Sequence, residues 1–355
     1  MFDLCIDARM INFSGIGTYL CELLVFIIPE FSTVLLGNEN ELNNFLKKNN
    51  LSSKIVEFNS KIYSISEQIR YPFIIPKCKV YWSPHYNIPL TPIKARKRLT
   101  TIHDLNHIAL GKSLSFIERL YAGFVMKKAI KLSNKIITVS KFSMSEIEKY
   151  YREQEKINLI YNGINIENFI SDKDSIRYNL PDEYVLYVGN IKPHKNIKGA
   201  IESFNIYKKK YKSELKLVIV GKKEGLINSE DILYNENILF LENVSFPDLV
   251  GIYRRAKIFL FLSFYEGFGL PVLEAQASGV PVICSNRGSL IEVSNGSCME
   301  VAPNSYEDVA NMLNDLLVNS SLYSNYVEKG FDNIKNFPWN ISAYKHIQLI
   351  KSLLK

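Results

Sequence analysis

The sequence has few of the features that mark a secreted, zinc-binding or membrane-spanning protein. Its 355 residues include five cysteines, an odd number. They form no Cys-x-x-Cys pair or Cys/His cluster, which argues against a disulfide framework and a zinc site. No apolar run reaches the ~18 residues that a membrane span needs. The N-terminal residues lack the basic start and cleavage site of a signal peptide. These absences together predict a cytoplasmic protein.

Acidic residues are scarce relative to basic ones in the first half. Residues 1–166 carry 22 Lys and Arg against 14 Asp and Glu, a balance of +8, whereas the remainder carries 21 against 22. A basic half of this kind fits contact with an anionic substrate or an anionic membrane surface, and it equally fits a solvated basic face. The motifs of zinc fingers, recognition helices and RNA-binding sheets are absent, so no nucleic-acid partner is expected.

Apolar segments typical of strands alternate with helical patterns along the whole chain. This alternation predicts α/β domains with doubly wound parallel sheets, in which ligands bind outside the carboxyl ends of the strands. A turn at Asn162-Gly163 lies between two such series, so we predict an N-terminal domain of residues 1–166 and a C-terminal domain of residues 167–339, followed by a last helix of about 340–355. The predicted strands are 2–6, 33–36, 54–58, 80–82, 98–102 and 135–139 in the first half, and 184–188, 215–220, 238–241, 258–262 and 282–284 in the second.

Residues 258–293 contain the strongest candidate for a functional site. A strand of the buried type leads into a glycine loop, and a helix begins behind that loop. Gly267 and Gly269 let the backbone approach a ligand closely, and the helix start offers N–H groups that suit an anion such as phosphate. Carboxylates that accept hydrogen bonds from sugar hydroxyls would fit beside it, which makes Glu266 and Glu274 candidates. The alternative is a plain glycine turn with both carboxylates solvated.

Other polar residues follow predicted strands. Gly15 and Gly17, in the segment SGIG, would form a glycine loop that opens a helix of about 17–28, a pattern that is weak evidence for phosphate on its own. His103 ends a strand, where it would either act on a substrate or only cap the strand. Lys195 stands near a helix start, where it suits a phosphate. A basic helix over 115–132 would either lie on an anionic membrane surface or pack on the core.

The stretch EGFGLPVLEAQASGVPV resembles the signature of the retaining glycosyltransferases of family 4 (glycosyl transferases group 1), in which two glutamates separated by seven residues flank a GFGLP-type loop. That family has the GT-B architecture, two Rossmann-like domains facing each other across a cleft. The resemblance also implies that the last helix, about 340–355, packs back on the N-terminal domain. The segments SGIG, PHYN (84–87), IHD (102–104), VGNIKPHKN (188–196) and LENVS (241–245) resemble other parts of the family, most closely its bacterial O-antigen and polysaccharide mannosyltransferases.

The resemblance implies a role for each matching residue. Glu266 would contact the donor hexose, Glu274 the nucleotide ribose, His103 the sugar beside the reacting carbon, and Lys195 the donor phosphate. Asn190 stands where the family usually has an arginine, which leaves open whether that charge is lost or supplied by a neighbour. The implied catalytic residues are Glu266, His103 and Lys195; the implied donor-binding residues are Gly15, Gly17, Asn190, Lys195, Val244, Gly267, Phe268, Gly269, Leu270 and Glu274; and the weaker acceptor-side candidates are His85, Tyr86, Asn87 and His107.

The implied reaction moves a hexose from a nucleotide sugar, with mannose from GDP-mannose as the first candidate and a UDP-hexose as the alternative. The implied acceptor is an oligosaccharide or an undecaprenyl-diphosphate-linked glycan of a bacterial surface polysaccharide, and a peripheral contact with the anionic inner membrane would bring the enzyme to it. No cofactor or metal is expected, because no DxD-type motif stands out and such family members generally work without a divalent cation. Glu266 would position the sugar, since a nucleophile of the paired-carboxylate type needs two carboxylates flanking one bond.

Two rival functions remain open at this stage. Another GT-B enzyme, such as a sugar-nucleotide epimerase, would convert the sugar nucleotide with no acceptor present. A non-catalytic sugar-nucleotide-binding protein would bind the nucleotide and release no diphosphate. The presence of both signature glutamates and of His103 argues against the non-catalytic function.

Overall fold

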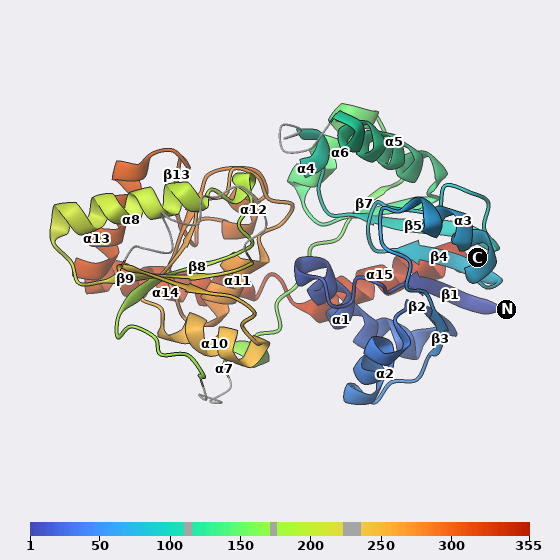
Figure 1. Cartoon of the computed structure of the whole chain (residues 1–355), viewed down its shortest axis with the longest axis horizontal. Helices are drawn as coiled ribbons and strands as arrows, with labels where there is room; N and C mark the ends of the chain where they lie inside the picture. The colour runs from blue at the N-terminus through green and yellow to red at the C-terminus, as the bar shows by residue number, and fades with distance from the viewer. Residues whose placement is uncertain (110–115, 171–175, 223–235) are drawn as a thin grey trace. The chain divides into compact units, whose positions relative to one another are not determined.

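The computed structural model describes residues 1–109, 116–170, 176–222 and 236–355, and it divides the chain into two compact units. The N-terminal unit consists of Met1–Gly163 together with Trp339–Lys355, and the C-terminal unit consists of Ile164–Pro338. Each unit has its own sheet with helices packed on its faces (Figure 1). The predicted α/β class with two Rossmann-like units is therefore confirmed.

The N-terminal unit is built on a parallel sheet whose described strands follow the order β3-β2-β1-β4-β5-β6-β7. The inner strands are apolar and buried on both faces, as covered parallel strands must be. The strands are β1 (Phe2–Asp7), β2 (Thr33–Gly37), β3 (Lys54–Glu57), β4 (Cys78–Ser83), β5 (Ala95–Ile102), β6 (Lys135–Thr138) and β7 (Ile157–Leu159).

The helices of this unit divide between the two faces of the sheet according to the direction of their connections. Crossovers between parallel strands are right-handed, so connections that run toward β3 cover one face and those that run toward β7 cover the other. The first group is α1 (Ser14–Ile27), extended by the 3-10 turn η1 (Ile28–Glu30), and α2 (Glu39–Lys48); the last helix of the chain, α15 (Trp339–Leu354), packs on α1 and β4. The second group is α3 (Ile65–Ile74), α4 (Asn106–Ala109), α5 (Phe116–Leu132) and α6 (Lys141–Tyr151).

The C-terminal unit repeats this plan with a parallel sheet whose described strands follow the order β10-β9-β8-β11-β12-β13. A buried cluster joins α8 and α13 to one face of the sheet, while α11 and α14 pack together. The strands are β8 (Tyr184–Val188), β9 (Lys216–Val220), β10 (Ile238–Leu241), β11 (Ile258–Phe261), β12 (Val282–Ser285) and β13 (Met299–Val301). The helices are α7 (Glu167–Ile170), the 3-10 turn η3 (Pro193–Lys195), α8 (Ile197–Tyr211), α10 (Phe246–Arg255), α11 (Leu270–Ala277), α12 (Leu290–Ser294), α13 (Tyr306–Val318) and α14 (Ser320–Ile334).

Each sheet reverses its strand order once, and this reversal locates the candidate sites. The reversal lies between β1 and β4 in the N-terminal unit and between β8 and β11 in the C-terminal unit. Ligands of doubly wound sheets bind outside the carboxyl ends of the strands at such a switch point. The segment 84–87 follows β4, whereas Lys195 and Glu266 follow β8 and β11. Both sets of candidate residues therefore lie where this fold places its binding sites.

One sequence prediction was wrong in detail. Gly15 and Gly17 do not form a loop before a helix, because α1 already begins at Ser14. A Cβ at Gly17 would lie 2.5 Å from the carbonyl oxygen of Ile11, so glycine at this position allows close packing of the helix start against the segment that precedes it. The helix predicted over 115–132 is present as α5, Phe116–Leu132. There, Val125 and Ile130 are buried, but Leu120, Phe124 and Leu132 face solvent.

Candidate active site

Lys195 and Glu266 form an ion pair between the segments that follow two neighbouring strands. The Lys195 ammonium lies 2.7 Å from Oε1 and 2.8 Å from Oε2 of Glu266. Lys195 ends the turn η3 after β8, and Glu266 lies in the loop after β11. The side chains are 21% and 9% exposed, respectively. Partial exclusion of water strengthens the attraction between the two charges relative to a surface pair.

The segments that carry the ion pair are tied together by hydrogen bonds. The Phe264 N–H donates to the carbonyl oxygen of His194 at 2.8 Å, and the Asn196 side-chain amide donates to the carbonyl oxygen of Leu262 at 3.0 Å. Asn196 adopts a left-handed backbone with a φ of 53°, and its side-chain oxygen accepts a backbone N–H in the first turn of α8. This buried side chain therefore fixes both the start of α8 and the end of β11.

The glycine loop before α11 is also held in one conformation. Gly269 has a φ of 108°, and a Cβ there would lie 2.5 Å from the Leu290 side chain, so only glycine fits. The Ser289 hydroxyl lies 2.9 Å from the carbonyl oxygens of both Glu266 and Phe268, to which it donates. The loop, which includes Gly267 and ends at Leu270, thus leads into a fixed helix start. The positive end of the helix dipole at such a start favours a bound anion.

The second signature glutamate, Glu274, lies on α11 and accepts a hydrogen bond from the Tyr253 hydroxyl at 2.9 Å. Burial raises the pKa of the Glu274 carboxyl to about 7, although the hydrogen bond from Tyr253 acts in the opposite direction. Its charge therefore changes near neutral pH. Asn190 and Val244 are half-buried in the segments that follow β8 and β10. These three candidate donor-binding residues, Glu274, Asn190 and Val244, therefore lie on α11 or after the carboxyl ends of strands of the C-terminal sheet.

His103, in the N-terminal unit, follows β5 and makes a hydrogen bond that fixes its tautomer. Its Nε2 lies 2.9 Å from the carbonyl oxygen of Pro84. A carbonyl can only accept, so Nε2 carries the proton and Nδ1 of the neutral ring is an acceptor. Burial lowers the pKa of His103, although the Pro84 carbonyl acts in the opposite direction. The Tyr19 ring stands edge-on to the imidazole, with 4.8 Å between the ring centroids.

A buried chain of hydrogen bonds holds Tyr19 in place. It runs from Trp82 Nε1 to Thr101 Oγ1 (3.0 Å), to the Tyr19 hydroxyl (3.0 Å), to His346 Nε2 (2.7 Å), and from His346 Nδ1 to the Ser342 carbonyl oxygen (2.7 Å). Burial lowers the pKa of His346 to about 4, so its ring is neutral. Because an indole N–H only donates and a carbonyl only accepts, every proton in the chain points the same way.

Two of the acceptor-side candidates, His85 and Asn87, belong to a buried charged cluster. Arg9 donates from Nε and Nη2 to the Asp7 carboxylate at 2.8 and 2.6 Å, and from Nη1 to Glu67 at 2.8 Å. Asn87 donates to Glu67 at 2.6 Å, and His85 Nε2 lies 3.6 Å from Asp7. Burial alone would raise the pKa of the Asp7 carboxyl, but Arg9 outweighs it and that pKa lies well below its usual value. His85 and Asn87, the weaker acceptor-side candidates, therefore have buried side chains in this structure, and their contact with an acceptor stays a prediction.

The other two acceptor-side candidates are placed differently. Tyr86 is half-buried, and its ring lies 5.7 Å from that of Tyr63. The side chain of His107 lies outside the described part of the structure. Tyr86 is thus the one residue of the PHYN segment after Pro84 whose side chain reaches the surface.

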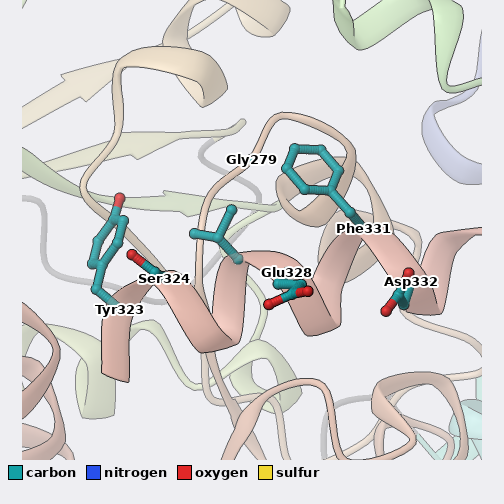
Figure 2. A pocket seen from close by; sticks show the side chains of 7 residues that line it. Gly279, Tyr323, Ser324, Glu328, Phe331 and Asp332 are labelled. Carbon is teal, nitrogen blue, oxygen red and sulfur yellow. The ribbon is translucent and has the colours of Figure 1, made fainter. Parts of the chain in front are cut away.

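The pocket drawn in Figure 2 is a separate feature of the C-terminal unit and contains none of the candidate residues. Gly279 follows the C-terminal end of α11, whereas Glu266 and the glycine loop precede its N-terminal end. The pocket is lined by Gly279 and by Tyr323, Ser324, Val327, Glu328, Phe331 and Asp332 of α14. Among the described residues, no group of three His, Cys, Asp or Glu side chains is arranged to hold a metal ion.

Several side chains that shape the site carried no recognisable signal in the sequence. Ser289 and Asn196 hold the loops of the C-terminal unit, Tyr253 binds Glu274, and Tyr19 and His346 lie behind His103. Each acts on a partner that is distant along the chain, with the exception of the cap made by Asn196. A polar residue in an apolar segment was the one feature that could have drawn attention to His346.

Solved structures with the same fold identify the architectural class. The glycosyltransferase from Rickettsia africae ESF-5 matches with a TM-score of 0.73 over 99% of this chain and 98% of that chain, at 19% identity. Anabaena Alr3699/HepE, solved with UDP and glucose, matches with a TM-score of 0.75 over 99% and 100% of the two chains, at 13% identity. At these identities the likeness establishes the fold, which is that of the GT-B glycosyltransferases.

Comparison with family models then gives the family. The model named Glycosyltransferase Family 4 matches residues 64–168, and the model named Glycosyl transferases group 1 matches residues 169–332. The O-antigen chain mannosyltransferase RfbU of Salmonella typhimurium is 29% identical over 74% of this chain and 72% of its own length. The O-antigen chain mannosyltransferase B of Escherichia coli is 27% identical over 75% and 74%. This chain belongs to the family-4 glycosyltransferases, and it is a sugar-transferring enzyme, as its glutamate signature indicated.

Across the four described ranges, no helix has both the length and the apolar character required to cross a bilayer.

Proposed function

We propose that this glycosyltransferase transfers mannose from GDP-mannose to a growing bacterial surface polysaccharide. Support for the sugar comes from relatives that are named O-antigen chain mannosyltransferases and that align over about three quarters of the chain. A UDP-hexose is the alternative donor, because a protein of the same fold was solved with UDP and glucose. The segments SGIG, PHYN and IHD favour the polysaccharide branch of the family.

The observation that carries the proposal is the Lys195–Glu266 ion pair at the switch point of the C-terminal sheet. A nucleotide sugar offers each member of the pair a new partner. Its diphosphate suits the ammonium of Lys195, and its sugar hydroxyls suit the carboxylate of Glu266. The N–H groups and dipole at the start of α11 supply further positive potential for the phosphate. The ionised form of Glu274 would accept hydrogen bonds from the ribose hydroxyls.

The difficult step of the reaction is departure of the nucleoside diphosphate from the anomeric carbon. Negative charge grows on the phosphate in that step, and positive groups that are already in place lower the barrier. We assign this role to Lys195 and to the N–H groups at the α11 start. The transfer retains the anomeric configuration by front-face attack, in which the leaving phosphate takes the proton of the acceptor hydroxyl. Glu266 then stabilises the positive charge that develops on the sugar.

His103 has the right protonation state for a contact with the donor sugar. Its Nε2–H is committed to the Pro84 carbonyl, which leaves Nδ1 as an acceptor for a sugar hydroxyl. The proposed mechanism requires no charged histidine at any step, which agrees with the lowered pKa of His103. The proposed mechanism also requires no divalent cation.

The proposed acceptor is an oligosaccharide carried on undecaprenyl diphosphate or a similar lipid diphosphate. A glycan on such a carrier is presented at the cytoplasmic face of the inner membrane, so the enzyme would work in the cytoplasm with a peripheral membrane contact. The names of the relatives and the excess of basic residues in the first half support this acceptor.

The test is release of nucleoside diphosphate from a panel of GDP-mannose, UDP-glucose, UDP-galactose and UDP-N-acetylglucosamine, with and without EDTA. We expect one donor to be hydrolysed slowly without acceptor, EDTA to have no effect, and Glu266→Gln to abolish the release. Glu328→Gln, which changes an acid of the α14 pocket, is the matched control. Conversion of a sugar nucleotide into its epimer would support the first rival function. No release from any donor would overturn the proposal.

A further inference from the structure

Helix α3 presents a row of three large apolar side chains to solvent. Ile65, Ile69 and Phe73, which we call the α3 ridge, are 78%, 63% and 78% exposed. They are spaced four residues apart, and residues at this spacing lie on one face of a helix. The opposite face of α3 is anchored in the core, where Glu67 and Tyr71 are fully buried. The helix therefore has one apolar face that the fold of its own unit does not use.

A solvent-exposed ridge of this kind needs a partner to account for it. A helix on a sheet normally turns its apolar stripe inward and its polar residues outward. In α3 the buried face instead includes the carboxylate of Glu67, which pairs with Arg9 at 2.8 Å. Continuous exposed apolar surface marks a contact with another molecule or with a membrane.

The charges around the ridge identify the kind of partner. Within residues 60–77 the exposed charged side chains are Lys61, Arg70 and Lys77, and the single acid of the segment is the buried Glu67. Directly beside the end of this segment, the Cys78 N–H donates to the carbonyl oxygen of Lys94. Lys94 begins a basic run that continues with the exposed side chains of Arg96 and Lys97. The apolar ridge is thus bordered by positive charge.

Helix α5 adds to the same side of the molecule. The connections that contain α3 and α5 both run toward β7, so both helices cover the same face of the sheet. Leu120 and Phe124 of α5 are about half exposed, and Lys127 and Lys131 are exposed beside them. From the sequence, α5 was the helix with a membrane surface as one of its two possible contacts, whereas in the structure α3 has the more exposed apolar side chains.

We propose that the α3 ridge docks on an anionic lipid bilayer, with its apolar side chains entering the boundary between headgroups and acyl chains and the flanking lysines and arginines meeting the headgroups. Basic residues beside an exposed apolar helix face are the combination that binds such surfaces. The biological purpose of this docking rests on the proposed lipid-linked acceptor. The docking itself requires neither donor nor acceptor and can be measured separately.

The experiment is cosedimentation of the full chain with vesicles of phosphatidylglycerol and phosphatidylethanolamine, and with vesicles of phosphatidylcholine alone. The ridge variant is Ile65→Ser/Ile69→Ser/Phe73→Ser. The matched control is Ile341→Ser/Tyr344→Ser, which removes exposed apolar side chains from α15 on the other face of the sheet. We expect binding to the anionic vesicles that weakens with salt, at least tenfold weaker binding of the ridge variant, and unchanged binding of the control.

Thermal unfolding of both variants without lipid, and mannose transfer to a short soluble acceptor, complete the test. Equal vesicle binding by the wild type and a stably folded ridge variant would overturn the proposal. The proposal would also be overturned if the wild type does not bind vesicles but self-associates in sedimentation velocity while the ridge variant stays monomeric. The partner of the ridge would then be a second copy of the chain. Failure of sugar transfer with intact vesicle binding would refute the proposed function and leave the docking surface in place.

Discussion

The ion pair between Lys195 and Glu266 should be measurable as a coupling free energy of unfolding without any donor. Two unit charges about 4 Å apart attract by about 4 kcal/mol at an effective dielectric constant of about 20. Desolvation offsets part of this attraction. Fully exposed pairs contribute at most about 1 kcal/mol, and breaking a fully buried pair costs about 3–5 kcal/mol. With side chains 21% and 9% exposed, we expect a coupling of about 1.5–3 kcal/mol.

The assay is urea unfolding of the wild type, Lys195→Met, Glu266→Gln and the double variant, combined as a double-mutant cycle. Equal m-values across the four proteins would show that the unfolded states are comparable. Unfolding free energies that add within about 0.5 kcal/mol would refute the pairing, since independent sites behave in that way.

The same variants separate donor binding from sugar transfer. Glu266→Gln removes the carboxylate that competes with phosphate for Lys195, so nucleoside diphosphate should bind at least as tightly as to the wild type. Sugar transfer should nevertheless fall by about 10²–10³, the effect of losing one group that stabilises charge in a transition state. Equal losses in nucleotide binding and in transfer would contradict the division of roles between the two residues.

Four further variants test other parts of the structure. Gly15→Ala should raise the free energy of unfolding in urea by about 0.5–1 kcal/mol, because nothing lies within 4 Å of the added Cβ. Gly17→Ala should lower it, because the added Cβ meets a backbone carbonyl oxygen. Full activity of Gly15→Ala would argue against contact between Gly15 and the donor. The wild type should lose about 2 kcal/mol of stability as the pH rises from about 5 to 8, because the folded pKa of Glu274, about 7, lies above the unfolded value and ionisation then opposes folding. Glu274→Gln should remove this pH dependence. Identical pH profiles of the two proteins in urea unfolding would contradict the prediction. Tyr19→Phe should lower the free energy of unfolding in urea by about 1–3 kcal/mol, because it leaves Nε2 of His346 buried without its hydrogen-bond donor. An unchanged urea midpoint would contradict the direction assigned to the hydrogen bond from Tyr19 to His346.

Strands of both sheets could be predicted because their signals are local. The strand at 184–188 and the strand at 238–241 were predicted at the bounds that the structure gives, since each is a short apolar run between turn residues. The start of α1 was misplaced because Gly15 and Gly17 are read locally as turn residues. Packing of Gly17 against the carbonyl oxygen of Ile11 overrides that preference.

The contacts that organise the candidate site could not be predicted in the same way. Lys195 and Glu266 were each identified, but nothing in a single sequence indicates that residues 71 positions apart share an ion pair. The burial of His85 and Asn87 depends on Asp7 and Arg9 at the end of β1 and on Glu67 of α3, which are distant from them along the chain. Periodicity reports which face of an element is buried, and it carries no information on which polar groups meet inside.

The last helix illustrates how such distant contacts reach the candidate catalytic residues. The N-terminal unit ends its first segment at Gly163 and resumes at Trp339, and a Cβ on that glycine would lie 2.5 Å from the backbone nitrogen of Trp339. Only after this return does Nε2 of His346 reach Tyr19 and accept a hydrogen bond from its hydroxyl. Tyr19 in turn packs edge-on against His103. The tautomer of His103 is set within the first segment by Pro84, whereas the ring that packs on it is oriented by α15. Docking of α15 therefore completes the surroundings of His103, and a chain that ended before Trp339 would keep the histidine and lose the group that holds its neighbour.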